Sequence, residues 1–147
     1  MNFCVNIKKL NEKAIIPTYG SEFSAGADLY AATDAPVEVA PHTTVLVGTG
    51  IAMEIPEGYC GLIFARSGLS VKRGLAPANK VGVIDADYRG EIKVALHNHT
   101  ELPVTVDAGE RIAQISIVPF LKAAFCESEE LSDTVRGEGG FGSTGRK

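Results

Sequence analysis

Apolar residues recur at every second position in several stretches of this chain, and turn sequences separate these stretches. The alternation covers residues 3–8, 37–39, 92–97 and 102–106. Because successive side chains of a β-strand point to opposite faces of a sheet, such alternation places one face of each strand on a core. A helical period extends over no useful length, and the best candidate for one is a short turn at residues 67–74. The pattern therefore predicts an all-β protein.

Turn sequences rich in Gly, Pro, Asp and Ser recur at intervals of about 8 to 12 residues, which is typical of a β-sandwich, barrel or jelly roll. Three further runs, at residues 43–55, 59–66 and 111–120, are rich in β-branched residues. Such runs are typical of strands that are buried on both faces or that lie at a contact between subunits. We therefore expect strands of both kinds to share one core.

The domain organisation follows from where this patterning stops. A chain of 147 residues is long enough for one domain with a sizeable core. Residues 1–120 form the predicted β domain, and residues 121–135 are polar and acidic and form a predicted connector. Residues 136–147 are rich in glycine, so they cannot bury enough apolar surface to offset the entropy of ordering. We expect a flexible C-terminal arm there.

Charge and composition exclude several classes of partner. The net charge of −4 provides no basic stripe for nucleic acid, so an anionic ligand needs a local cluster of donors. No apolar run is long enough to span a bilayer, and the first ten residues lack the apolar core of a signal peptide. The three cysteines are widely spaced, as expected for reduced thiols in a cytoplasmic protein.

Two short stretches interrupt the strands with groups suited to phosphate. In the sequence ARSGLS (65–70), a guanidinium (Arg66), a hydroxyl (Ser67) and a glycine that permits close backbone approach (Gly68) follow one another. These are the donors that phosphate needs, although a surface loop with an unpaired arginine is the alternative. In AGADLYA (25–31), Asp28 precedes an apolar strand, and a turn aspartate that bonds its own backbone is the simpler interpretation.

The stretch from Asn79 to Glu91, NKVGVIDADYRGE, is predicted to form a β-hairpin with polar groups at its turn. Asp85 follows two large apolar residues, which places it at the mouth of an apolar pocket, where partial burial suits a carboxylate to accept a proton from water. Tyr88 offers a flat ring that can pack against a sugar or a base. The alternative is that these side chains only shape and pack the turn.

Two polar groups near the end of the β domain, Arg111 and Gln114, lead into buried sequence and need partners from the protein or from a ligand. For Arg111, the neighbouring Glu110 or an acid of another subunit is an alternative partner. His97 and His99 share one face of a predicted strand, but no third ligand stands at a useful spacing. We therefore expect solvent-facing histidines there and no metal site.

The five motifs AGADLY, RSGL, GVIDADYRG, GERIAQ and RGEGGFGSTG stand in this order between residues 25 and 145. In this order and spacing the chain closely resembles the homotrimeric dUTP diphosphatases (dUTPases). The resemblance implies a jelly-roll-like β-barrel subunit, a homotrimer, and active sites that draw motifs from all three chains. It also implies hydrolysis of dUTP to dUMP and pyrophosphate, which keeps uracil out of DNA and supplies dUMP for thymidylate synthesis.

The resemblance assigns roles to the residues of the third motif and its surroundings. Asp85 would be the base that activates a water for attack on the α-phosphorus. Val83 and Ile84 would present backbone groups to the uracil edge, and Asn79 would hold the base through an ordered water. Tyr88 would pack under the deoxyribose. Lys93 stands where the family makes a further substrate contact.

The remaining motifs would hold the phosphate chain and the metal. Asp28 would position water around Mg²⁺, a cofactor bound with the triphosphate and without direct protein ligands, while the role of Arg111 stays open. In the arm, Phe141 would stack on uracil. Ala65 stands where the family commonly has proline. The phosphate chain and the rest of the substrate would be bound by Arg66, Ser67, Gly68, Gln114, Arg136, Gly142 and Ser143.

Two alternatives to the diphosphatase keep the same fold. A dCTP deaminase, alone or bifunctional, resembles it but uses a glutamate in its base pocket, and the VIDADY sequence together with the glycine-rich arm favours the diphosphatase. A trimeric protein that binds nucleotide without hydrolysing it is the other alternative. The intact base and phosphate motifs argue against a purely binding role.

Overall fold

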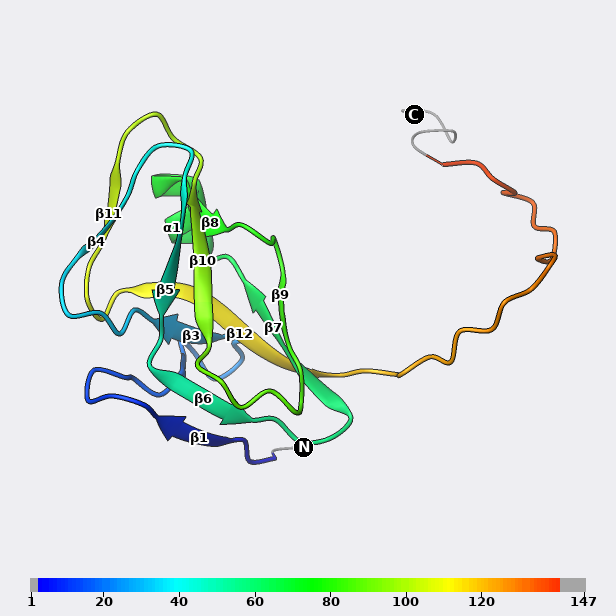
Figure 1. The fold of residues 1–147 in the computed structure, drawn as a ribbon, viewed down its shortest axis with the longest axis horizontal. Helices are drawn as coiled ribbons and strands as arrows, with labels where there is room; N and C mark the ends of the chain where they lie inside the picture. The colour runs from blue at the N-terminus through cyan, green and yellow to red at the C-terminus, as the bar shows by residue number, and fades with distance from the viewer. Residues whose placement is uncertain (1–2, 141–147) are drawn as a thin grey trace.

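In a computed structural model, the chain is described from residue 3 to residue 140 (Figure 1). The described residues are mostly strands with one short helix, so the prediction of an all-β protein is confirmed. No helix among them is long and apolar enough to cross a membrane. The elements are β1 (Asn6–Lys9), β2 (Thr18–Tyr19), β3 (Ala27–Tyr30), β4 (Val37–Val39), β5 (Thr44–Gly48), β6 (Ile51–Glu54), β7 (Tyr59–Phe64), α1 (Ser67–Arg73), β8 (Leu75–Pro77), β9 (Gly82–Ile84), β10 (Lys93–Asn98), β11 (Val104–Val106) and β12 (Arg111–Pro119).

The strands of the described chain form antiparallel sheets that enclose one core. The largest sheet has the order β2-β3-β12-β7-β9, and a three-stranded sheet has the order β5-β10-β8. Two further pairs, β1-β6 and β4-β11, complete the wall. Strands far apart in the sequence lie side by side, since β3 pairs with β12 and β7 pairs with both β12 and β9. The fold therefore depends on non-local pairings.

The core follows from the alternation in the sequence. Along β10, Val94, Leu96 and Asn98 are buried, while Lys93 points outward. Burying each large apolar side chain contributes about 1.5–3 kcal/mol. The one polar member of this buried face, Asn98, is fully paired: its amide donates to the carbonyl oxygens of Val39 (2.9 Å) and Leu102 (2.8 Å), and its Oδ1 accepts from Thr100. Asn98 thereby joins β4, β10 and the loop before β11.

The helical turn expected at residues 67–74 is the seven-residue helix α1. It begins after Arg66, whose backbone is extended, and it packs through Leu69, its buried residue. Gly74 ends it in the left-handed conformation (φ 69°), and the Gly74 N–H donates to the carbonyl of Ser70. α1 therefore presents Ser67 at its first turn, directly beside Arg66.

Two expectations about the strands need correction. The run 43–55 forms two strands, β5 and β6, in different sheets, and the Leu46 side chain on β5 is 68% exposed, so within one chain this run is not buried on both faces; the alternative, a contact between subunits, stays a prediction. The predicted hairpin at Asn79 to Glu91 does not form either, because β9 pairs with β7 whereas β10 pairs with β5 and β8. The loop between β9 and β10 instead connects two sheets.

After β12 the chain leaves the β domain. Residues 120–140 contain no helix or strand, and Figure 1 shows this segment running away from the sheets. Phe120 is still 44% exposed and its N–H donates to the carbonyl of Gly58, but beyond it the large apolar side chains are almost fully exposed, with Leu121 at 98%, Phe125 at 97% and Leu131 at 90%. In a single chain, therefore, the connector packs on nothing.

Candidate active site

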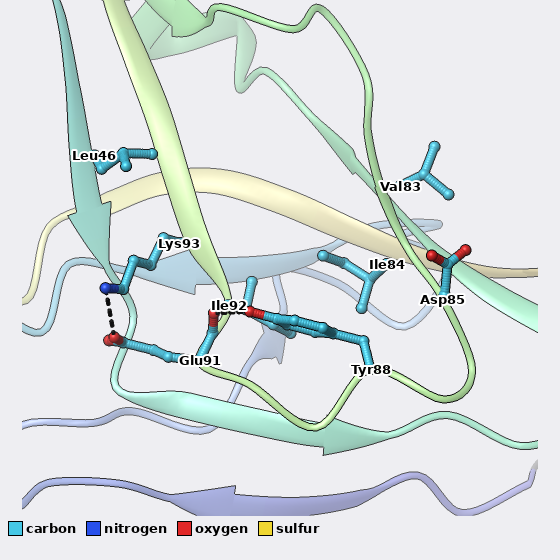
Figure 2. A pocket seen from close by; sticks show the side chains of 8 residues that line it. All are labelled: Leu46, Val83, Ile84, Asp85, Tyr88, Glu91, Ile92 and Lys93. Atoms are coloured by element: carbon cyan, nitrogen blue, oxygen red, sulfur yellow. Dashed lines mark hydrogen bonds and ion pairs between the residues drawn. The ribbon is translucent and has the colours of Figure 1, made fainter.

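The predicted site residues of the β domain gather around three cavities of the described chain. The first, of about 420 Å³, lies along the loop between β9 and β10 (Figure 2). It combines an apolar floor with a carboxylate, a phenol ring and one ion pair. Its lining residues are Leu46, Val83, Ile84, Asp85, Tyr88, Glu91, Ile92 and Lys93.

Asp85 is the carboxylate of this loop and follows directly after β9. Figure 2 shows its carboxylate on the side of Val83, while the Tyr88 ring extends across the loop in the other direction. Asp85 is exposed, so its own chain does not supply the partial burial expected for it. An exposed carboxylate beside an apolar pocket is accessible to water, which suits it to act as a base once a ligand or a partner chain closes over it.

Tyr88 spans the loop from one end to the other. Its backbone N–H donates to the carbonyl of Asp85 (3.2 Å), and its hydroxyl donates to the carbonyl of Glu91 (3.0 Å). The ring lies so close to Gly90 that a Cβ at this position would collide with its hydroxyl end. Tyr88 therefore has a fixed direction although its side chain is 43% exposed.

The second cavity is a narrow slot of about 170 Å³ between β9 and β10. It exists because these strands diverge into different sheets. β9 is the edge strand of its sheet, so its free edge presents backbone N–H and C=O groups to the slot. Asn79 lies at the same cavity, with its Nδ2 close to Gly82. A slot with apolar walls and free backbone donors and acceptors suits a small planar heterocycle.

The third cavity, of about 370 Å³, brings together residues from the first, second and fourth motifs. Asp28 is its centre: one carboxylate oxygen accepts from Arg66 Nε (2.7 Å), and the other lies 3.3 Å from Arg111 Nη1. Arg66 also donates to the carbonyl of Arg111 (3.3 Å). Ser67 and Gly68 line the same cavity, and Gln114 donates to the carbonyl of Ala65 (2.9 Å).

These contacts correct three of the simpler interpretations. Asp28 is no turn residue but a strand residue of β3, 8% exposed and paired with two arginines. Arg66 is therefore not an unpaired surface arginine. Arg111 does not pair with Glu110, because Glu110 forms an ion pair with Arg73 and accepts from the backbone of Asp107. Two guanidinium groups around one carboxylate leave a net positive charge, which suits this cavity to an anion.

The first and third cavities share no lining residue, so one chain keeps the Asp85 loop apart from the arginine cavity. Arg136 lies on the exposed segment beyond β12, where its Nε donates to the carbonyl of Gly139 (2.8 Å). Phe141, Gly142 and Ser143 lie outside the described residues. The parts of the predicted site are thus distributed over separate places of the subunit.

Sequence reasoning missed Glu91, which lines the first cavity. Its Oε1 accepts from the backbone N–H of Gly50 (3.0 Å), and its Oε2 lies 3.4 Å from Lys93 Nζ. The signal that points to it is a lone acid directly after a glycine and before an apolar strand, which is too common to be informative. Its partner Gly50 is far away in the sequence.

The potential metal ligands of the described chain form no cluster. Among residues 3–140, no three His, Cys, Asp or Glu side chains are placed to hold a metal ion together. The His97 and His99 rings pack edge to face with centroids 4.6 Å apart. Partial desolvation lowers the pKa of His99, and the nearby His97, Lys80 and His42 lower it further. The one carboxylate of the arginine cavity, Asp28, can still accept from a water through its remaining lone pairs.

Fold and site together define a class of small β proteins that can hold a planar group in a strand-lined slot and an anion among arginines. A family model described as dUTPase matches residues 12–145. The deoxyuridine 5'-triphosphate nucleotidohydrolase of Hydrogenobaculum sp. is 51% identical over 141 residues, which are 96% of this chain and 97% of that protein. The chain belongs to the dUTPase family, so the resemblance seen in the sequence is confirmed.

Solved structures agree with this assignment. The dUTPase of Staphylococcus bacteriophage 80alpha with dUPNHPP has a TM-score of 0.91 and 31% identity, over 98% of this chain and 99% of that one. A mutant of the dUTPase from phage phi11 of S. aureus, described with a structural Mg(II) ion, has a TM-score of 0.78 and 26% identity, over 87% of this chain and 98% of that one. The predicted jelly-roll-like β subunit is thereby confirmed.

Proposed function

We propose that this chain hydrolyses dUTP to dUMP and pyrophosphate. The observation that carries the proposal is the slot between β9 and β10, with Asp85 and Tyr88 at the adjoining pocket. A planar base in this slot brings its sugar to Tyr88 and its α-phosphate toward Asp85. Membership of the dUTPase family supports the same substrate.

In the proposed reaction, Asp85 accepts a proton from a water molecule whose oxygen attacks the α-phosphorus. The bond from that phosphorus to the α–β bridging oxygen breaks, and the bridging oxygen leaves with pyrophosphate. Positioning of the water in line with the leaving group and neutralisation of the departing charge account for the acceleration. The exposed position of Asp85 in one chain supports this role, because the attacking water must reach it.

Base and sugar selection are assigned to the slot and its rim. The backbone groups of Val83 and Ile84 pair with the uracil edge, and Asn79 holds the base through a water. Cytosine leaves these buried groups unpaired, at about 1–3 kcal/mol per group. The walls of the slot reject the 5-methyl group of thymine by contact. The Tyr88 ring packs under the deoxyribose and rejects a 2′-hydroxyl.

The triphosphate is assigned to the arginine cavity, where Arg66, Ser67, Gly68 and Gln114 donate to phosphate oxygens. Because this cavity and the Asp85 pocket are separate in one chain, a homotrimer in which two subunits contribute one cavity each completes the site. Lys93 adds a contact near the slot. The arm of the third chain closes over the nucleotide through Arg136, Phe141, Gly142 and Ser143.

Mg²⁺ is proposed as the cofactor, bound with the triphosphate. The described residues fit a metal that phosphate oxygens and water hold, since Asp28 at the arginine cavity keeps lone pairs that can accept from water. When bound, the ion supplies charge neutralisation on the phosphate chain. Asp28 acts on it indirectly, by ordering water at the edge of the arginine cavity.

In a cell, this reaction keeps uracil out of DNA and supplies dUMP for thymidylate synthesis. We place the protein in the cytoplasm, without nucleic acid or membrane as partners. The net charge of −4 supports the absence of nucleic acid as a partner, because the chain provides no basic stripe for a polyanion.

The test is release of pyrophosphate from dUTP in the presence of Mg²⁺, with dTTP, dCTP and UTP as controls. We expect turnover of dUTP alone, and its loss when EDTA removes the metal. Ammonia release from dCTP would identify a deaminase instead. Tight binding of dUTP without any pyrophosphate would identify a protein that only binds nucleotide.

A further inference from the structure

We propose that Glu91 is a positioning residue that fixes the Tyr88 ring and thereby sets the discrimination between dUTP and UTP. This inference rests on the proposed function, since it concerns the sugar that Tyr88 faces. Glu91 lines the same pocket as Tyr88. Its side chain points back into the protein, toward the turn between β5 and β6 (Figure 2).

The side chain of Glu91 anchors the loop to a buried turn. Its Oε1 accepts from the N–H of Gly50 (3.0 Å), and the glycine at position 48 leaves room for the carboxylate, since a Cβ there would lie 2.5 Å from the same oxygen. Thr49 between them is 1% exposed and donates to the carbonyl of Ile92 (2.6 Å). Two hydrogen bonds thus fix residues 91 and 92 on the same rigid support.

The backbone of Glu91 in turn holds the ring. The Tyr88 hydroxyl donates to the Glu91 carbonyl, and the Tyr88 N–H donates to the carbonyl of Asp85, so the ring is fixed at both ends of the loop. The ion pair of Glu91 with Lys93 holds the carboxylate on its other side (3.4 Å). Without the carboxylate, the Gly50 N–H loses its acceptor. The carbonyl that anchors Tyr88 then keeps only the support of its own peptide group, in which the Ile92 N–H donates to the carbonyl of Ile51 (2.9 Å).

This geometry separates sugar selection from the chemical step. A ring that rejects the 2′-hydroxyl by contact must not move by more than a fraction of the size of an oxygen atom, whereas deoxyribose tolerates a looser ring. Loosening Tyr88 therefore affects UTP and dUTP unequally. The expected signature is a rise of kcat/KM for UTP, with kcat for dUTP largely kept.

The experiment compares Glu91→Ala with Glu91→Gln and with Glu38→Ala, which removes an exposed glutamate on β4. We expect Glu91→Ala to lower the ratio of kcat/KM for dUTP to that for UTP about tenfold, the size of effect that a lost charge-assisted hydrogen bond has. Glu91→Gln keeps an oxygen acceptor for Gly50, so its ratio stays within about threefold of the parent. Glu38→Ala leaves the ratio unchanged. An unchanged ratio in Glu91→Ala, or an equal loss in Glu91→Gln, would overturn the proposal.

Tyr88→Phe supplies an independent check, since it removes the hydrogen bond from the Tyr88 hydroxyl to the Glu91 carbonyl and leaves the Glu91 side chain in place. We expect it to lower the ratio as well, and the double variant with Glu91→Ala to show no further loss, because both changes release the same ring. Full additivity would contradict the shared mechanism. Should Glu91→Ala fail to fold, Glu91→Met takes its place: it keeps most of the side-chain length but offers the Gly50 N–H no oxygen acceptor, so the same fall of the ratio is expected, and a parent-like ratio would overturn the proposal.

Amide hydrogen exchange at Gly50, followed by NMR, tests the contact without substrate. Faster exchange in Glu91→Ala and parent-like exchange in Glu91→Gln support the anchor, whereas equal exchange in all variants would refute it. The exchange experiment therefore separates the proposed function from the proposed role of Glu91. If the parent protein hydrolyses no dUTP, the proposed function is refuted, but exchange at Gly50 still tests whether Glu91 anchors the loop.

Discussion

Asp28 shows how a single residue can organise the anion cavity. Its carboxylate lies on β3, has a side chain that is 12% exposed, and holds Arg66 and Arg111 on opposite oxygens. Without it, two like charges would stand next to each other in a partly buried place, which is unfavourable. Two arginines and one aspartate give the cavity one net positive charge. This local charge can attract an anion although the chain as a whole has a net charge of −4.

The first prediction therefore concerns Asp28→Asn, which keeps the size of the side chain and removes its charge. Because both arginines lose their counter-ion, we expect the free energy of unfolding to fall by about 1–3 kcal/mol, discounted for the partial exposure of the arginines. Urea unfolding followed by circular dichroism measures the change. Asp133→Asn on the exposed connector is the control, and equal stability of the two variants would contradict the role of Asp28.

At the scale of elements, α1 carries the phosphate-binding residues to their place. The helix starts after Arg66, so Arg66, Ser67 and Gly68 reach the same cavity. Its far end is tied to the turn before β12, because Arg73 pairs with Glu110 and also donates to the carbonyl of Thr105. The helix therefore has its first residues at the arginine cavity and its last residue tied to Glu110 and Thr105.

The second prediction tests how this helix ends. Gly74 has a φ of 69°, and a Cβ there would collide with the methyl group of Thr100. Because a left-handed conformation costs a non-glycine residue about 1–2 kcal/mol before any collision, we expect Gly74→Ala to lower the free energy of unfolding by about 2 kcal/mol or more. Thermal and urea unfolding measure it. Gly68→Ala, with no atom near its added Cβ, is the matched control for stability, and a Gly74→Ala as stable as that control would refute the argument.

The strands that the sequence predicts well are those whose signal is local. The buried face of β10 could be identified from the alternation of Val94 and Leu96, and α1 from its short helical turn. The pairing of β9 could not, because its partner on β7 lies some twenty residues away along the chain and only tertiary packing selects it. For the same reason, the motifs indicated Arg111 and Asp28 separately, but only the structure shows that the two side chains pair.

At the scale of the whole molecule, one chain holds the parts of the proposed site at separate places. The Asp85 pocket and the arginine cavity are separate, and the connector exposes Leu121, Phe125 and Leu131 to solvent. Three large apolar side chains left almost fully exposed on one segment are unfavourable in water, so a surface that covers them would be favourable. We propose a homotrimer because assembly of copies would cover such side chains and would bring the separate cavities together.

The third prediction concerns the arm. Deletion of everything after Val135 removes Arg136 and the glycine-rich sequence but leaves the connector and the β domain in place. We expect an intact trimer in analytical ultracentrifugation and a severe loss of dUTP turnover, since the nucleotide is no longer covered. Near-normal turnover of the truncated protein would show that the arm is only a tail.

The central claim, that Asp85 activates the water that attacks dUTP, is tested most directly by Asp85→Asn. Asparagine has the same shape but cannot accept the proton, so we expect pyrophosphate release to fall by about 10²–10⁴-fold. Binding of a non-hydrolysable dUTP analogue, measured by calorimetry, should stay within about threefold of the parent, because the slot and the arginine cavity are untouched. Parent-like turnover in Asp85→Asn, with binding unchanged, would contradict the account.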